Sequence, residues 1–149
     1  MRPYLIAANS SWYLNHYRSS LIKEVKKYWR HQIALCPLDS SSIELEKQLL
    51  FIPWKTNRSK DSDFFNLLIS LIRVTFLIRA LKPSLIHSHT LKANFLISIA
   101  TSIYSTRTVL SFAGLGKFYR SKGFIKIIFE LIIKFILFSS KVERTKGFT

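Results

Sequence analysis

Short apolar runs alternate with helical segments along this chain of 149 residues, and no other feature constrains the fold as strongly. The apolar runs are continuous rather than alternately polar and apolar, which is typical of strands buried on both faces. We predict strands over residues 4–8, 32–36, 49–54, 84–89 and 106–112. Strands of this kind, separated by helices, predict a parallel sheet with helices on both faces. The sequence therefore predicts the α/β class, in the order βαβαβαβαβ.

Four helices are predicted between these strands. Apolar residues recur at steps of three and four over residues 16–30, which predicts an amphipathic helix there. Serines at 40–42 can cap a short helix that ends at Lys47. Longer helices are predicted over residues 64–81, which Pro83 ends, and over residues 91–104.

Residues 124–138 form the most apolar stretch and predict a C-terminal amphipathic helix. Fifteen residues give a helix of roughly 22 Å, which is too short for a hydrocarbon core of about 30 Å. Its charges are spaced four residues apart and share one stripe, which leaves a wide apolar face. Such a helix either lies in a bilayer interface or packs against another protein surface. Lysines that would contact a membrane here are Lys122, Lys126 and Lys134.

The length predicts one α/β domain over residues 1–123, followed by the helix and a tail over residues 124–149. The formal net charge is +15, and residues 64–129 contain no acidic residue. This middle segment is expected to face an anionic partner. A nucleic-acid-binding module is an alternative, but it is unfavoured because no helix forms a basic stripe and most aromatics lie in apolar runs.

Cys36 is the only cysteine, which excludes a disulfide framework and a cysteine metal cluster. The apolar run at residues 4–8 is too short for the core of a signal peptide. Both observations favour the cytoplasm.

Ligands of parallel sheets bind outside the carboxyl ends of the strands, so three connecting loops are candidate sites. In the first, at residues 9–15, Asn9 and Ser10 precede a helix and either hold a phosphate or form an ordinary capped turn. Arg18 could reach an anion over this loop, or it could be solvated. In the third, at residues 113–123, Gly114 and Gly116 allow a ligand to approach the backbone closely.

The second loop, at residues 87–94, is the strongest catalytic candidate. His87 and His89 would point the same way on a strand, either as a metal pair or with His87 packed in the end of the sheet. We expect no metal, because no third ligand of a suitable kind stands out. His89 as a general base fits better, with Lys92 and Asn94 as contacts to an anionic ligand.

The three loops together resemble the N-terminal half of family 4 glycosyltransferases of the GT-B fold. The resemblance is strongest to enzymes that build lipid-linked oligosaccharides and surface polysaccharides. Three segments carry it: Asn-Ser-Ser-Trp-Tyr-Leu-Asn-His-Tyr-Arg at residues 9–18, His-Ser-His-Thr-Leu-Lys-Ala-Asn at residues 87–94, and Gly-Leu-Gly-Lys-Phe-Tyr at residues 114–119. With the apolar helix that follows, the resemblance covers nearly the whole chain.

Such enzymes have two Rossmann-like domains, with the acceptor mainly on the first and the nucleotide sugar mainly on the second. The resemblance implies that this chain is the Rossmann-like, acceptor-side half of a truncated or split enzyme, without the donor-binding domain, which a separate chain could supply. It places a polyprenyl-diphosphate acceptor near Arg18, Lys92 and the loop of Gly114. It implies no cofactor, and a peripheral position at the inner face of the membrane, with the last helix on the cytoplasmic leaflet. A non-catalytic membrane-surface protein is the remaining alternative.

Overall fold

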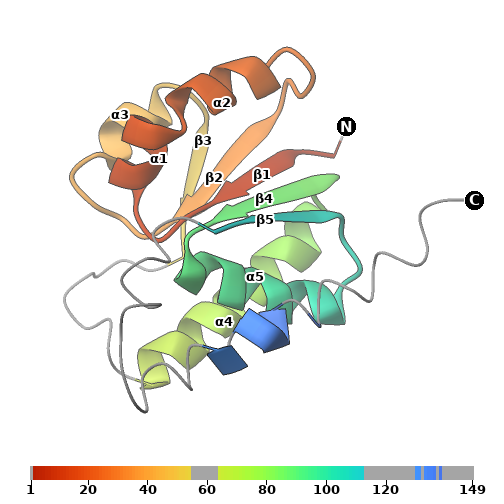
Figure 1. The fold of residues 1–149 in the computed structure, drawn as a ribbon. Helices are drawn as coiled ribbons and strands as arrows, with labels where there is room; N and C mark the ends of the chain where they lie inside the picture. Colours follow the sequence, from red (N-terminus) through yellow and green to blue (C-terminus); the bar gives the residue numbers. More distant parts are fainter. Residues whose placement is uncertain (1, 55–63, 113–129, 132, 137, 139–149) are drawn as a thin grey trace, which may run out of the picture.

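A five-stranded parallel sheet forms the centre of the molecule in the computed structural model, which describes residues 2–54, 64–112, 130–131, 133–136 and 138 (Figure 1). The strands are β1 (Tyr4–Ala7), β2 (Gln32–Cys36), β3 (Leu50–Pro53), β4 (Leu85–His89) and β5 (Thr108–Ser111). Their order in the sheet is β3-β2-β1-β4-β5, and every neighbouring pair is parallel. This is a Rossmann-like arrangement, because the chain moves outward from β1 in one direction and then crosses over to β4 on the other side.

Helices cover both faces of the sheet, as predicted (Figure 1). One layer contains α1 (Ser11–Tyr17), α2 (Ser19–Val25) and α3 (Ser42–Glu46), and the other contains α4 (Phe64–Leu81) and α5 (Leu91–Ile103).

Alternate side chains of β1 enter the two layers, because successive residues of a strand face opposite sides of the sheet. Leu5 is fully buried in the cluster that contains Val74 of α4, whereas Ile6 is fully buried in the cluster that contains Leu14 and Ile22. The central strand therefore joins two hydrophobic cores, and this explains why its sequence is apolar at every position.

The strand at Gln32–Cys36 and the helix at Phe64–Leu81 have the predicted bounds, but only residues 19–25 of the predicted first helix at residues 16–30 form one continuous helix, and an additional helix precedes them. The chain becomes helical at Ser11, because the Ser10 hydroxyl accepts a hydrogen bond from the Tyr13 N–H at 3.1 Å and caps an earlier start. Helix α1 then ends at Tyr17, since Arg18 leaves the helical conformation at φ −127° and ψ 6°. Two short helices consequently replace one long one.

The described residues between 130 and 138 are helical and lie on the α4–α5 side of the sheet (Figure 1). The Phe135 ring centroid lies 6.1 Å from that of Phe95 on α5, and Ile136 is fully buried. Residues 124–129 of the predicted C-terminal helix lie outside the described part of the chain. Among the described residues, no helix has both the length and the apolar character to cross a membrane.

Candidate functional site

The carboxyl ends of β1 and β4 meet where the direction of the chain through the sheet reverses. Ligands of open parallel sheets bind in the crevice at such a point. The loops that leave the two strands are joined there, because the Asn9 backbone N–H donates to the Thr90 hydroxyl at 3.1 Å. The first and second candidate loops therefore form one site, although about 80 residues separate them in sequence.

Arg18 and His89 form the centre of this site. His89 ends β4 and is 1% exposed, and its Nδ1 accepts a hydrogen bond from Arg18 Nε at 3.2 Å. The same guanidinium donates to the Tyr13 hydroxyl at 2.8 Å and to the Tyr17 carbonyl at 3.1 Å. Arg18 can reach these three partners because it lies at the break between α1 and α2. The half-buried guanidinium is thus fixed in position rather than solvated.

His89 is held as a neutral imidazole. Burial, followed by the charges of His87 and Arg18, lowers its pKa to about 3. Because Arg18 donates to Nδ1, the proton of the neutral ring lies on Nε2. This Nε2 is buried and has no hydrogen-bond partner among the described residues. The environment favours a neutral hydrogen-bond donor over the general base that we expected, since an imidazole with so low a pKa accepts a proton poorly near neutral pH.

His87 supports the ring of His89. The two ring centroids lie 4.1 Å apart, so the histidines point the same way, as their spacing predicts. His87 Nδ1 is hydrogen-bonded to the Tyr4 hydroxyl at 3.1 Å, and its Nε2 to the Ser111 hydroxyl at 2.8 Å. Burial, with a smaller contribution from Arg18, lowers its pKa. Both ring nitrogens are occupied, which favours the packed interpretation of His87 over a metal pair. The described residues contain no cluster of three potential metal ligands.

The N-terminus of α1 is satisfied internally, which argues against the phosphate site predicted at Ser10. The Ser10 hydroxyl is used for capping, and Asp39 supplies an anion that we did not predict from the sequence. The Asp39 carboxylate accepts hydrogen bonds from the Ser11 hydroxyl, and from the Trp12 and Ser41 N–H groups at 3.2 and 2.9 Å. Burial alone would raise the pKa of Asp39, but these hydrogen bonds outweigh it and lower the pKa.

A sequence signal for Asp39 exists in the run Asp-Ser-Ser-Ser at residues 39–42, which follows β2. Aspartate commonly accepts from the N–H two residues further on, as it does here from Ser41. What the sequence could not show is that the same carboxylate would cap a helix that begins 28 residues earlier.

The N-terminus of α5 differs from that of α1, because its N-cap residue makes no side-chain capping hydrogen bond. Its N-cap is Thr90, whose hydroxyl is occupied by the Asn9 N–H and whose backbone has φ 74° and ψ 148°. Positive φ is costly for a β-branched residue and is concentrated at functional sites. Lys92, half-buried in the first turn of α5, adds a positive charge to a helix end that already favours anions.

Asn94, which we expected among the ligand contacts, is fully buried. Its amide nitrogen donates to the Ser111 carbonyl at 3.0 Å. This hydrogen bond ties α5 to the end of β5, close to the Ser111 hydroxyl that holds His87. The Asn94 Oδ1 atom is buried and has no hydrogen-bond partner among the described residues. Asn9 is exposed at the mouth of the site. Of the remaining predicted residues, Lys134 is exposed on the last helix, and Gly114, Gly116, Lys122 and Lys126 lie outside the described part of the chain.

The family model described as "Glycosyl transferase 4-like" matches residues 4–142. The match covers every strand of the sheet and all the described residues of the site. No curated protein matches the chain significantly.

Proposed function

The chain belongs to the glycosyl transferase 4-like family, and on this basis we propose that it binds a glycosyl acceptor at the carboxyl ends of β1 and β4 and positions it for sugar transfer. Membership of the family implies a nucleotide-sugar donor and a glycosyl acceptor in general. The observation that most supports an acceptor site is the Arg18–His89 pair, which combines a fixed cation with a buried donor that has no partner in the described part of the chain.

The acceptor that we propose carries a diphosphate, as in a polyprenyl-diphosphate-linked sugar. The guanidinium of Arg18 keeps N–H groups beyond the three that are used internally, because it has five donors. The first N–H groups of α5 and the charge of Lys92 follow His89 directly in the chain, at the carboxyl end of β4. A diphosphate between them would receive charge-assisted hydrogen bonds, which are roughly twice as strong as neutral ones.

In this proposal, His89 donates its Nε2–H to an oxygen of the bound acceptor. The unpartnered, buried Nε2 would then gain a hydrogen bond when the ligand binds. His87, Tyr4 and Ser111 are positioning residues, because they fix the ring plane of His89 without contacting the ligand.

We also propose that the domain attaches to the cytoplasmic leaflet through the α4–α5 side. Exposed apolar side chains gather there, on α4 at Ile69, Ile72 and Phe76, and on the last helix at Leu131, Phe135 and Phe138. Lys134 is exposed on the last helix, and no acidic residue occurs between residues 64 and 129. An apolar surface with positive charges suits an anionic bilayer interface.

A second, donor-binding domain would complete the enzyme, either on the same polypeptide or on a separate chain. The experiment is to co-express this chain with such a domain and to measure sugar transfer to a polyprenyl-diphosphate acceptor. Transfer that requires both parts, and that falls by about tenfold or more in Arg18→Gln but not in Lys23→Gln, would support the proposal. Lys23 is a matched control, since it is an exposed cation on α2. Transfer that is unchanged in Arg18→Gln would exclude acceptor binding at this site.

A further inference from the structure

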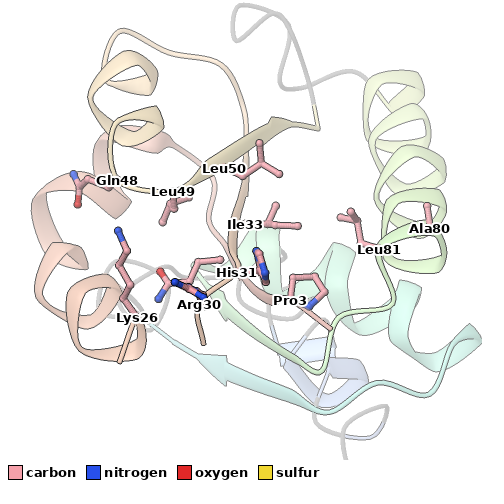
Figure 2. Close-up of a pocket in the computed structure, with 11 residues that line it drawn as sticks. Pro3, Lys26, Arg30, His31, Ile33, Gln48, Leu49, Leu50, Ala80 and Leu81 are labelled. Carbon is pink, nitrogen blue, oxygen red and sulfur yellow. The ribbon is translucent and has the colours of Figure 1, made fainter. Parts of the chain in front are cut away.

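A cavity of about 550 Å³ lies at the amino-terminal edge of the sheet (Figure 2). The Arg18–His89 site lies at the opposite end of the strands, because His89 ends β4 whereas Gln32 and Leu50 begin β2 and β3. It is formed by the beginning of β2, the beginning of β3 and the end of α4, where Leu81 contributes. Its volume lies within the range of small-molecule sites. No residue of the acceptor site lines it, so the proposed function leaves it unexplained.

The residues that line the cavity include a cationic group and an apolar group. Lys26, Arg30 and the His31 imidazole occupy one part of the rim, and no acidic side chain lines the cavity. Ile33, Leu50 and Leu81 supply an apolar wall (Figure 2). A ligand that fits both parts has an anionic group and a carbon skeleton.

Gln32 adds a hydrogen-bond acceptor. Gln32 is one of the residues that line the cavity, and it is 6% exposed. The amide nitrogen donates to the Ile22 carbonyl at 3.1 Å, which fixes the orientation of the amide. The Oε1 atom then remains buried without a hydrogen-bond partner among the described residues. A buried acceptor of this kind is normally paired, so a ligand that donates a hydrogen bond would satisfy it.

Gln48, a second residue lining the cavity, repeats the pattern. Its amide nitrogen donates to the Asn15 side-chain oxygen at 2.9 Å, and its Oε1 is buried without a partner within the described ranges. Two unpartnered amide oxygens beside two cations select against a plain inorganic anion, because such an anion offers them few donors.

We propose that this cavity binds a small phosphate monoester that carries hydroxyl groups, the class to which sugar phosphates and nucleoside monophosphates belong. The phosphate lies against Lys26 and Arg30, and a hydroxyl donates to Gln32 Oε1. Because Gln32 and Ile33 face opposite sides of the sheet, the carbon skeleton crosses the start of β2 to reach Ile33 and Leu81. This second site is separate from the transfer chemistry and does not depend on the proposed function.

The test is calorimetric titration of the full chain with glucose 6-phosphate, uridine monophosphate, inorganic phosphate, glucose and uridine. At least one monoester is expected to bind about tenfold or more tightly than inorganic phosphate and than its own unphosphorylated form. Tighter binding of glucose 6-phosphate would indicate a sugar phosphate as the ligand. Tighter binding of uridine monophosphate would indicate a nucleoside monophosphate. Absence of saturable binding by both monoesters, or binding of inorganic phosphate equal to theirs, would overturn the proposal.

Variants locate the site. Arg30→Glu is expected to weaken monoester binding by about tenfold or more, because it replaces a charge-assisted contact by a repulsive one. Lys23→Glu is the control, since it reverses an exposed charge on α2 that does not line the cavity. Gln32→Met keeps the side-chain length but removes both the acceptor and the donor to the Ile22 carbonyl, so its folding is checked by thermal melting. The folded variant is expected to bind the monoester more weakly than the original chain does. If Arg30→Glu and Lys23→Glu weakened monoester binding equally, only long-range attraction between the basic protein and the phosphate would be shown. This result would contradict the assigned site.

Discussion

The Nε atom of Arg18 lies 3.2 Å from Nδ1 of His89, across 71 residues of sequence. This hydrogen bond joins the break between two short helices to the end of the fourth strand. It fixes the tautomer of His89, and it holds a cation in the crevice where ligands of parallel sheets bind.

Replacement of Arg18 by glutamine is expected to raise the pKa of His89, since the nearby positive charge disfavours the imidazolium. The pKa should nevertheless stay below the ordinary histidine range, because burial is the larger cause and remains in the variant. An NMR titration of the His89 ring measures both effects. An ordinary pKa in the variant would show that Arg18, and not burial, is the main cause.

Stability should fall on acidification because His87 and His89 are held neutral. Their pKa values in the folded protein lie below 6.5, so below that pH the unfolded chain binds more protons than the folded one. The contribution of the two neutral histidines to the free energy of unfolding is complete above pH 6.5. It decreases as the pH falls toward about 3, the pKa of His89 in the folded protein. Each histidine adds up to about 1.4 kcal/mol per pH unit to the slope of the free energy of unfolding against pH.

Urea unfolding between pH 7 and pH 4 measures this slope. His89→Asn should reduce it, because asparagine does not titrate, whereas His16→Asn serves as the control at an exposed position. A slope that is the same in His89→Asn and in the original chain would contradict the burial of a neutral His89.

Loss of the Asp39 carboxylate should destabilise the domain. Asp39→Ala is expected to lower the free energy of unfolding by about 1–2 kcal/mol, since the Trp12 and Ser41 N–H groups and the Ser11 hydroxyl lose their acceptor. Urea denaturation measures this change in the free energy of unfolding. Glu46→Ala removes an exposed carboxylate from α3 and should change stability by no more than about 0.5 kcal/mol. Equal effects of the two substitutions would exclude the capping role of Asp39.

Membrane attachment should depend on the apolar surface of α4. Ile72 and Phe76 are 59% and 70% exposed, and burial of such side chains contributes up to about 1.5–3 kcal/mol each. The double change to serine should lower binding to anionic vesicles by about tenfold or more in a sedimentation assay. Ile43→Ser is the control, since Ile43 is 69% exposed on α3, which covers the other face of the sheet.

Lys134→Glu should weaken vesicle binding as well, by about 1 kcal/mol for the lost attraction, and the weakening should vanish on neutral lipid. Vesicle binding that survives both the serine substitutions and Lys134→Glu would exclude the α4–α5 side as the attachment surface.

Much of the fold was predictable because continuous apolar runs indicate buried parallel strands. The strand at 32–36 and the helix at 64–81 have the predicted bounds. The bounds of the first helix were not predicted, because a tertiary contact interrupts the helix. Its apolar period continues through Arg18, whereas that residue adopts a non-helical conformation in which its guanidinium contacts Tyr13 and His89.

The candidate site was predictable in its location and only partly in its roles. Its loops were identified because they follow strands, but Asp39 was missed, since its effect depends on a contact with α1. The strained backbone of Thr90 gave no signal either, because threonine is not a residue that indicates positive φ. The complete burial of Asn94 could not be inferred from a short polar loop motif.

The most direct test of the acceptor site is the affinity of the purified chain for a short-chain, water-soluble polyprenyl diphosphate, measured by titration calorimetry. We predict saturable binding that is weakened by about tenfold or more in Arg18→Gln and is unchanged in Lys23→Gln. Binding that is the same in all three proteins, or no binding to the original chain, would contradict an acceptor site at Arg18 and His89.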